Sequence, residues 1–102
     1  MGSIGTFEFS APLWLHRGEG SWHFLSVPAE ISDDIAELTA GNRKGFGSVR
    51  VRVTVGASTW QTSVFPDSKS GMFVLPVKKS VRTAEQLSAG ADVQTLLQLV
   101  DY

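Results

Sequence analysis

The chain has 102 residues, the length of one small domain, and is too short to form two independent hydrophobic cores. Hydrophobic residues make up 42% and charged residues 19%, which excludes a disordered chain, a collagen and a coiled coil. The absence of cysteine excludes disulfides, thiolate metal sites and a cysteine nucleophile. A formal net charge of −1 argues against a generally basic nucleic-acid-binding protein.

The hydropathy of the chain predicts a cytoplasmic protein without membrane association. No stretch of about 18 consecutive apolar residues is present, and the N-terminus lacks the charged and then apolar layout of a signal peptide. We expect a single domain over residues 6–101. Residues 1–5 are expected to be a flexible N-terminus or the remnant of an expression tag.

The first half of the chain changes from a strand pattern to a helix pattern at Pro28. Apolar side chains alternate over residues 6–15, which predicts a half-buried strand with Pro12 at an edge or a bulge. After a glycine-rich turn, a second strand is expected over residues 21–27. Apolar residues then recur every three or four positions, which predicts a short amphipathic helix near 29–39.

The second half begins with the clearest alternation in the sequence. The valines of residues 49–55 alternate with polar side chains, and Gly56 starts a turn into a hairpin. The other expected elements are strands over 59–65, 72–75 and 92–100 and a helix near 77–87. The sequence therefore predicts a mainly β domain of about six strands and two short helices.

A strand, a proline, a short helix and a glycine occur in the same order twice. Pro28 and Pro76, which lie 48 positions apart, mark the two copies. This order favours an internal two-fold repeat and a coincidence equally, because strand–proline–helix is a common local pattern. In a true repeat, the two strand–helix units would cap the two ends of one small barrel.

Several segments together resemble a bacterial family known as domain of unknown function 1905. They are Trp14, Gly18-Glu19-Gly20-Ser21-Trp22-His23-Phe24, Gly45-Phe46-Gly47-Ser48-Val49, Trp60-Gln61-Thr62-Ser63-Val64-Phe65-Pro66 and Leu75-Pro76-Val77-Lys78-Lys79-Ser80-Val81-Arg82. The resemblance implies a compact double-split β-barrel capped by strand–helix motifs, and it implies no reaction. Residues 75–93 are also similar to the AbrB and MazE type of swapped-hairpin DNA-binding protein.

The near-neutral total charge conceals three unlike segments. Residues 1–42 contain one Arg against six carboxylates, residues 43–82 contain eight Lys and Arg against one Asp, and residues 83–102 contain three carboxylates. Positive charge is therefore concentrated in the central segment. A local site for an anion remains compatible with the composition.

The first candidate anion site is at the expected second helix. Lys78 and Lys79 follow Pro76 at the positive end of the helix dipole, and Arg82 lies four residues after Lys78. Cations at that end are unfavourable by about 0.3–1 kcal/mol each when exposed. This favours a site for phosphate, sulfate or carboxylate. The alternative is that the three side chains are solvated or paired with carboxylates of the N-terminal third.

Two further groups of residues are weaker candidates. Arg43 and Lys44 lie in a glycine-rich loop that could hold an anion, although a flexible surface hairpin explains them better. His16 and His23 lack the spacing of metal ligands, so no metal site and no cofactor are expected. The candidate lining of an apolar pocket consists of Trp14, Trp22, Trp60, Phe24 and Phe65.

These features favour a non-enzymatic binding module with a basic anion-binding face. The expected partner is an anionic small molecule or a phosphate group, and a nucleic-acid backbone is a second partner of the same chemistry. The alternative is a small-molecule-binding protein or enzyme, in which Lys and Arg orient an anionic substrate in the aromatic pocket. A further alternative is an accessory or AbrB-like DNA-binding domain. A monomer and a homodimer are both compatible with the sequence.

Overall fold

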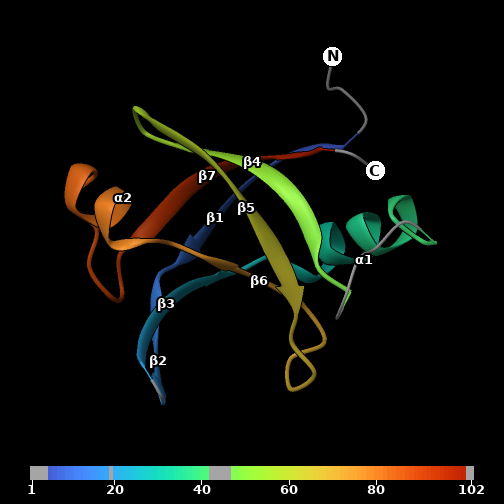
Figure 1. The fold of residues 1–102 in the computed structure, drawn as a ribbon, viewed down its shortest axis with the longest axis horizontal. Helices are drawn as coiled ribbons and strands as arrows, with labels where there is room; N and C mark the ends of the chain where they lie inside the picture. Colours follow the sequence, from blue (N-terminus) through green and yellow to red (C-terminus); the bar gives the residue numbers. More distant parts are fainter. Residues whose placement is uncertain (1–4, 19, 42–46, 101–102) are drawn as a thin grey trace.

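A computed structural model describes residues 5–18, 20–41 and 47–100 of the chain (Figure 1). In chain order the elements are β1 (Thr6–Pro12), β2 (Trp14–Gly18), β3 (Gly20–Ser26), α1 (Ala29–Leu38), β4 (Val49–Val55), β5 (Ser58–Pro66), β6 (Phe73–Pro76), α2 (Lys79–Ala84) and β7 (Asp92–Leu99). The expected mainly β class with two short helices is confirmed. The candidate residues Arg43 and Lys44 lie outside the described residues.

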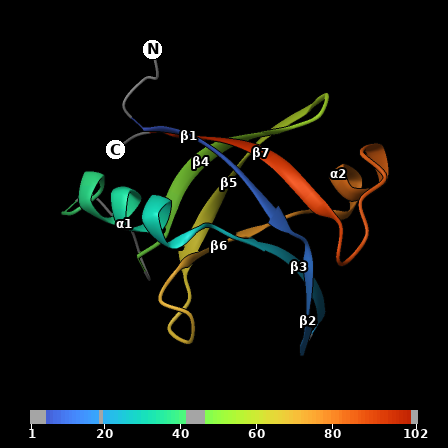
Figure 2. The same cartoon turned by 180° about the vertical axis from the view of Figure 1, so that it is seen from behind.

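All seven strands form one antiparallel sheet in the order β1-β7-β4-β5-β6-β3-β2. The sheet curls into a half-barrel, and β1 and β3 come into contact across the curl (Figures 1 and 2). The helices α1 and α2 lie at opposite ends of this half-barrel. The expected barrel-like sheet capped by two short helices is thereby confirmed.

The described residues form seven strands rather than the expected six or so, because the first predicted strand is divided at Leu13. The Leu13 N–H donates to the carbonyl of Ala91 (2.9 Å), and the N–H of Gly90 donates to the carbonyl of Leu13 (2.7 Å). The Leu13 side chain is only 1% exposed. Because this buried residue anchors the bend, β1 pairs with β7 whereas β2 turns away and pairs with β3.

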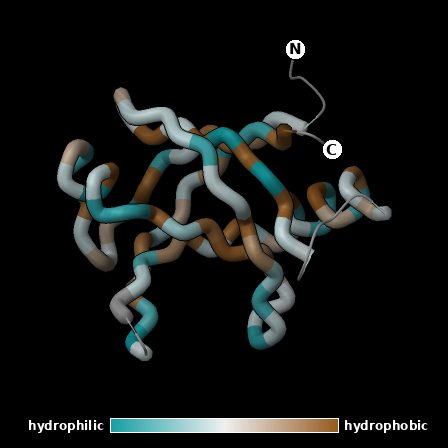
Figure 3. The backbone as a smooth tube through the Cα atoms, viewed as in Figure 1, coloured by the Kyte–Doolittle hydropathy of each residue, from teal (hydrophilic) through white to brown (hydrophobic). Residues whose placement is uncertain are grey.

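The core lies on the concave side of the sheet, where the alternating pattern places apolar side chains. Every second residue of β4 is a buried valine, and Arg50 and Arg52 between them are exposed. Figure 3 shows the same alternation of apolar and polar residues along the strands. Ile35 of α1 and Val81 of α2 are also buried in the core, so each helix closes one end of it.

The second helix is shorter than predicted. It spans Lys79–Ala84 rather than residues 77–87. Val77 lies before the helix, where its N–H donates to the carbonyl of His23 (2.9 Å). The helix ends because Gln86 has a positive φ of 55°, a conformation that a helix cannot contain. The first helix, Ala29–Leu38, agrees with its prediction near 29–39 to within one residue.

The end of α2 is fixed to the hairpin between β4 and β5. The hydroxyl of Ser58 donates to the carboxylate of Glu85 at 2.6 Å. The hairpin turns at Gly56, which has a φ of 58°, and a Cβ atom there would collide with the same carboxylate. The positive φ is the reason for glycine at this position, because the Glu85 carboxylate ends a flexible side chain that could move away from a Cβ.

The two strand–helix units are related by an approximate two-fold axis. β3 and β6 pair so that Leu25 faces Leu75. The Val27 N–H donates to the Phe73 carbonyl, and the Val77 N–H donates to the His23 carbonyl, both at 2.9 Å. Equivalent residues therefore lie 50 positions apart, not the 48 that separate the prolines. Pro28 and Pro76 are not equivalent, because Pro28 precedes α1 directly whereas Pro76 ends β6.

Candidate functional site

The outer face of the β2–β3 hairpin carries a row of aromatic rings. The hairpin register places Trp14 opposite Phe24 and His16 opposite Trp22, so the four side chains share one face. The ring centroids of Trp14 and Phe24 are 5.2 Å apart. Trp22 and Phe24 are nearly parallel, with an angle of 8° and a centroid distance of 6.1 Å. The row therefore forms one continuous aromatic surface.

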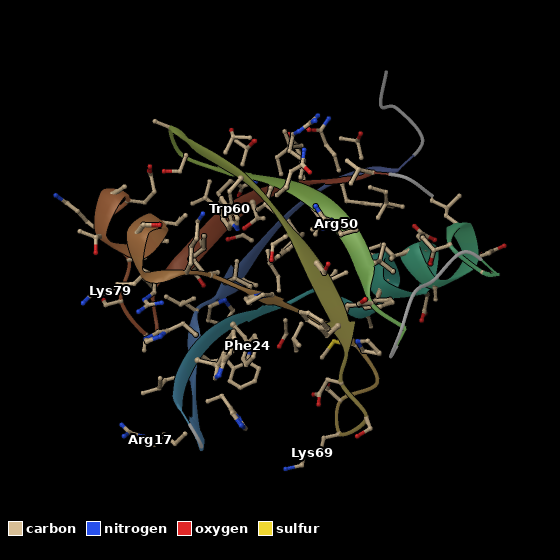
Figure 4. The ribbon with its side chains drawn as sticks, viewed as in Figure 1. Arg17, Phe24, Arg50, Trp60, Lys69 and Lys79 are labelled. Atoms are coloured by element: carbon tan, nitrogen blue, oxygen red, sulfur yellow. The ribbon has the colours of Figure 1, made fainter. Side chains whose placement is uncertain are left out.

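This surface is one wall of a cavity of about 570 Å³, which we call the aromatic groove. The groove is lined by Trp14, His16, Trp22, Phe24, Phe65, Pro66, Asp67 and Val74. The opposite wall comes from the end of β5 and the following loop. In Figure 4, Phe24 lies between two protrusions of the molecule, the β2–β3 hairpin with Arg17 and the β5–β6 loop with Lys69.

Hydrogen bonds hold the two walls of the aromatic groove in place. The indole N–H of Trp14 donates to the hydroxyl of Ser26 at 3.0 Å, which fixes the orientation of the ring. On the other wall, the Asp67 carboxylate accepts a hydrogen bond from the Ser70 hydroxyl at 2.8 Å. This bond is the main cause that lowers the pKa of Asp67, with a smaller contribution from nearby Lys69. The carboxylate is therefore ionised at neutral pH.

A second cavity, of about 490 Å³, lies next to the groove at the start of α2, and we call it the basic pocket. It is lined by Trp22, His23, Trp60, Gln61, Thr62, Pro76, Val77, Lys78, Lys79 and Arg82. Trp22 lines both cavities, and 53% of its surface is exposed. Lys78, Lys79 and Arg82 are thus brought together with Trp22 and Trp60, two of the five predicted aromatic residues.

Lys78 and Lys79 are exposed at the rim of the basic pocket. Neither ammonium group has an ion-pair or hydrogen-bond partner in the part of the chain that the structure describes. Within that part, the predicted alternative of pairing with N-terminal carboxylates is therefore not seen. Because α2 has only six residues, its dipole is a weak reason to expect an anion near these lysines. The reason to single out these lysines is now the cavity that they line.

Arg82 makes a structural contact in addition to lining the pocket. It lies in the last turn of α2. Its guanidinium Nη1 donates to the carbonyl of Val77 at 2.7 Å. Val77 is only 2% exposed, so this bond satisfies a buried carbonyl. Arg82 therefore holds the strand–helix corner together as well as lining the pocket.

The equivalent corner at α1 is built from Ser32 and Phe73 in place of Arg82 and His23. The Ser32 hydroxyl donates to the Val27 carbonyl (2.9 Å) and accepts the Phe73 N–H (3.0 Å). Ser32 and Arg82 thus cap carbonyls at equivalent positions, each five residues back along the chain. At the α2 corner the equivalent of Phe73 is a histidine that also lines a cavity.

His23, at the α2 corner, has a ring nitrogen without a hydrogen bond to any described residue. Its Nδ1 atom is buried and has no hydrogen-bond partner among the residues that the structure describes. Burial is the main cause that lowers the pKa of His23, and the charge of Arg82 lowers it further. The imidazole is therefore neutral at physiological pH. The sequence pattern was used only to exclude His23 as a metal ligand, and the burial of its Nδ1 atom could not be read from the alternation of β3.

The five predicted pocket residues divide between the two cavities. Trp14, Trp22, Phe24 and Phe65 line the aromatic groove, whereas Trp60 faces inward and lines the basic pocket. Two further residues of the aromatic groove, His16 and Asp67, were not predicted to line a pocket. The glycine-rich turn at residues 18–20 was the available signal for His16, because a tight turn there places residue 16 opposite residue 22. No sequence pattern pointed to Asp67, because the sequence of a loop does not show which other segment it will lie against.

Two comparisons and one property of the helices bear on the identity of the chain. In the described part, no helix is long and apolar enough to cross a membrane. A comparison with curated proteins found no match. The sequence pattern of the family described as Domain of unknown function (DUF1905) matches residues 9–97, which cover both cavities. The similarity of residues 75–93 to AbrB and MazE stays a prediction. The chain belongs to the DUF1905 family.

Proposed function

We propose that this domain binds a small organic anion that also carries a flat apolar group. The anionic group would lie in the basic pocket near Lys78 and Lys79, and the flat group would lie against Trp22. The observation that carries the proposal is that one cavity combines cationic side chains with two tryptophans. Trp22 is also the residue through which this cavity meets the aromatic groove.

The chemistry of the two lysines suits an anion. An ammonium group without a protein partner can bind a carboxylate or phosphate without first breaking an internal ion pair. The exposed face of Trp22 provides apolar contact for a ring, and burying such a face contributes free energy that a purely inorganic ion would not gain. The proposal therefore predicts that both halves of the ligand are needed.

The proposed binding mode does not require catalysis. His23 is the one neutral acid–base group that lines the basic pocket, and its Nδ1 is buried rather than open to the cavity. No described residue beside it provides a serine or threonine hydroxyl held as a nucleophile by a base within hydrogen-bond distance. The arrangement thus supports a binding module better than an enzyme.

A thermal-shift and calorimetry series with 1-naphthyl phosphate, 1-naphthol and inorganic phosphate tests the proposal. We expect 1-naphthyl phosphate to bind and to raise the melting temperature, and each isolated half to bind at least about tenfold more weakly, because each half lacks one set of contacts. Binding of naphthyl phosphate should weaken as salt rises, since the lysines are exposed to screening. Absence of binding at low salt would refute the proposal.

Matched variants locate the site. The double substitution Lys78→Ala, Lys79→Ala should weaken binding of naphthyl phosphate about fivefold, as expected for two exposed ion pairs. The control is Arg50→Ala, Arg52→Ala on the exposed face of β4, which changes the net charge by the same amount. An equal loss in both double variants would show that only the overall charge matters, which contradicts a local site.

A further inference from the structure

We infer that the aromatic groove and the basic pocket together bind a short segment of single-stranded nucleic acid. In this arrangement the bases stack in the groove and a phosphate enters the pocket. The inference rests on the proposed function, because the phosphate is the anion and a base is the flat group. It adds a second base-binding surface and a preference for a polymer over a monomer.

The groove presents ring faces that unpaired bases can stack on. Trp22 and Phe24 lie nearly parallel, and the outer ring, that of Trp22, is more than half exposed. Phe65 on the opposite wall is 42% exposed. Exposed rings that gather around one cavity are typical of a contact surface for a partner, whereas a single exposed apolar side chain is not. Stacking on such rings is how single-stranded nucleic acids are bound without sequence preference.

The size of the combined surface exceeds one nucleotide-sized ligand. The cavities measure about 570 and 490 Å³, and each falls within the range of about 300–1,000 Å³ that holds one small molecule. Trp22 lines both. A mononucleotide bound at the basic pocket would therefore leave the groove empty, whereas a longer strand would occupy both.

The charges around the two cavities favour a polyanion over a peptide. Lys78 and Lys79 lie at one end, and Arg17 and Lys69 lie on the two protrusions that border the groove (Figure 4). Asp67 is the single carboxylate among the described residues that line the cavities. An aromatic groove of this kind could also hold a proline-rich peptide. Such a peptide has no negative charge to complement four cations.

The geometry favours single strands over duplex. In a duplex the base faces are covered by neighbouring base pairs, so the exposed rings of Trp22 and Phe65 would gain nothing from it. The acidic side chains of α1 lie at the far end of the half-barrel from α2. Asp33 of α1 lines a third cavity that shares Pro66 and Asp67 with the groove. The phosphates of a strand are therefore favoured toward the α2 end of the two cavities.

Fluorescence anisotropy with an end-labelled hexathymidylate tests the inference, with thymidine monophosphate and a hairpin duplex as competitors. We expect the hexamer to bind at least about tenfold more tightly than the monophosphate, since each stacked base adds affinity. The duplex should compete poorly. Phe65→Ala should weaken hexamer binding about tenfold and leave monophosphate binding unchanged. Leu38→Ala, which truncates an equally exposed side chain on α1, is the control.

Each outcome decides between the two proposals. If the monophosphate binds through Lys78 and Lys79 but the hexamer binds no better, the proposed function stands and this inference is wrong. If neither binds while 1-naphthyl phosphate still does, only this inference is wrong, and if 1-naphthyl phosphate also fails to bind, both are wrong. Equal loss with Leu38→Ala, or equal binding of duplex and single strand, also overturns the inference.

Binding of a proline-rich decapeptide that depends on Phe65, without hexamer binding, would assign the groove to peptides. Phe65→Leu keeps the apolar bulk, so hexamer binding that survives this change contradicts stacking.

Discussion

Trp22 is held in an exposed position by its neighbours in the sheet. It pairs with His16 across the hairpin and lies against Phe24, so its ring is oriented although half of it faces solvent. An oriented ring loses less conformational entropy when a ligand packs on it than a freely rotating one would. This single residue therefore connects the two cavities and supplies contact area to either.

His23 makes the stability of the domain sensitive to moderately acidic pH. Its pKa is lowered below 6.5 in the folded protein, first by burial and then by Arg82. The unfolded chain therefore binds more protons than the folded one as the pH falls below 6.5. We expect the free energy of unfolding, measured with urea, to decrease from about pH 7 to about pH 5.5. Asp67, whose pKa is lowered from 3.8, adds its own loss only at more acidic pH.

Two substitutions separate His23 from other causes of this pH dependence. His23→Phe introduces the residue found at the equivalent position 73 and should make the stability nearly constant over the same pH range. His16→Gln removes the other histidine of the chain and should leave the decrease in place. A decrease that is unchanged in the first variant, or abolished in the second, would assign the effect to another group.

The elements that shape the site are the two strand–helix corners. Each corner caps a carbonyl at the end of the strand, with Ser32 at α1 and Arg82 at α2. The two side chains are chemically unlike, yet each donates a hydrogen bond to the backbone carbonyl at the equivalent position of its corner. Each corner borders a cavity, and Arg82 adds positive charge to the one at α2.

The capping role predicts how Arg82 variants behave. Arg82→Ala should lower the free energy of unfolding by about 1–3 kcal/mol, because it leaves the buried Val77 carbonyl without a donor. Arg82→Ser should retain part of that stability, since a serine makes the equivalent bond at the α1 corner. Urea denaturation measures both, with the exposed Lys79→Ala as control. Equal losses in the alanine and serine variants would show that the corners are not equivalent in energy.

The net charge of −1 conceals a separation of charge over the whole molecule, in which acidic and basic residues lie at opposite ends. The acidic residues of α1 lie at one end of the half-barrel, and the lysines at α2 lie at the other. A charge distribution of this kind orients an anionic partner toward α2 at long range. Solubility and local anion binding are thus both compatible with the same composition.

The join between the two halves is the pair formed by Leu25 and Leu75 on the approximate two-fold axis. Both side chains are fully buried. We expect Leu25→Ala and Leu75→Ala each to lower the free energy of unfolding by about 2–5 kcal/mol, because each leaves a cavity at the centre of the core. The exposed Leu38→Ala should cost less than about 0.5 kcal/mol in the same urea experiment. Strongly unequal losses for the two core leucines would contradict a symmetric join.

The sequence by itself determined the mainly β class, the positions of most strands, both helices to within a few residues and the candidate cations. These properties depend on local periodicity, and a period of two or of 3.6 residues is visible in the residues alone. Eight of the residues that line the two cavities were among the candidates, because aromatic residues and adjacent lysines are visible in the sequence. Their role in binding stays a prediction.

Only the tertiary structure decided how these parts meet. The split at Leu13, the 50-residue offset of the two units and the bond from Arg82 to Val77 each depend on partners far away in the chain or on the geometry of a corner. The meeting of Trp22, Trp60 and the lysines in one cavity likewise results from the pairing of β3 with β6 and of β6 with β5. Such contacts follow from the curl of the sheet, which no local pattern encodes.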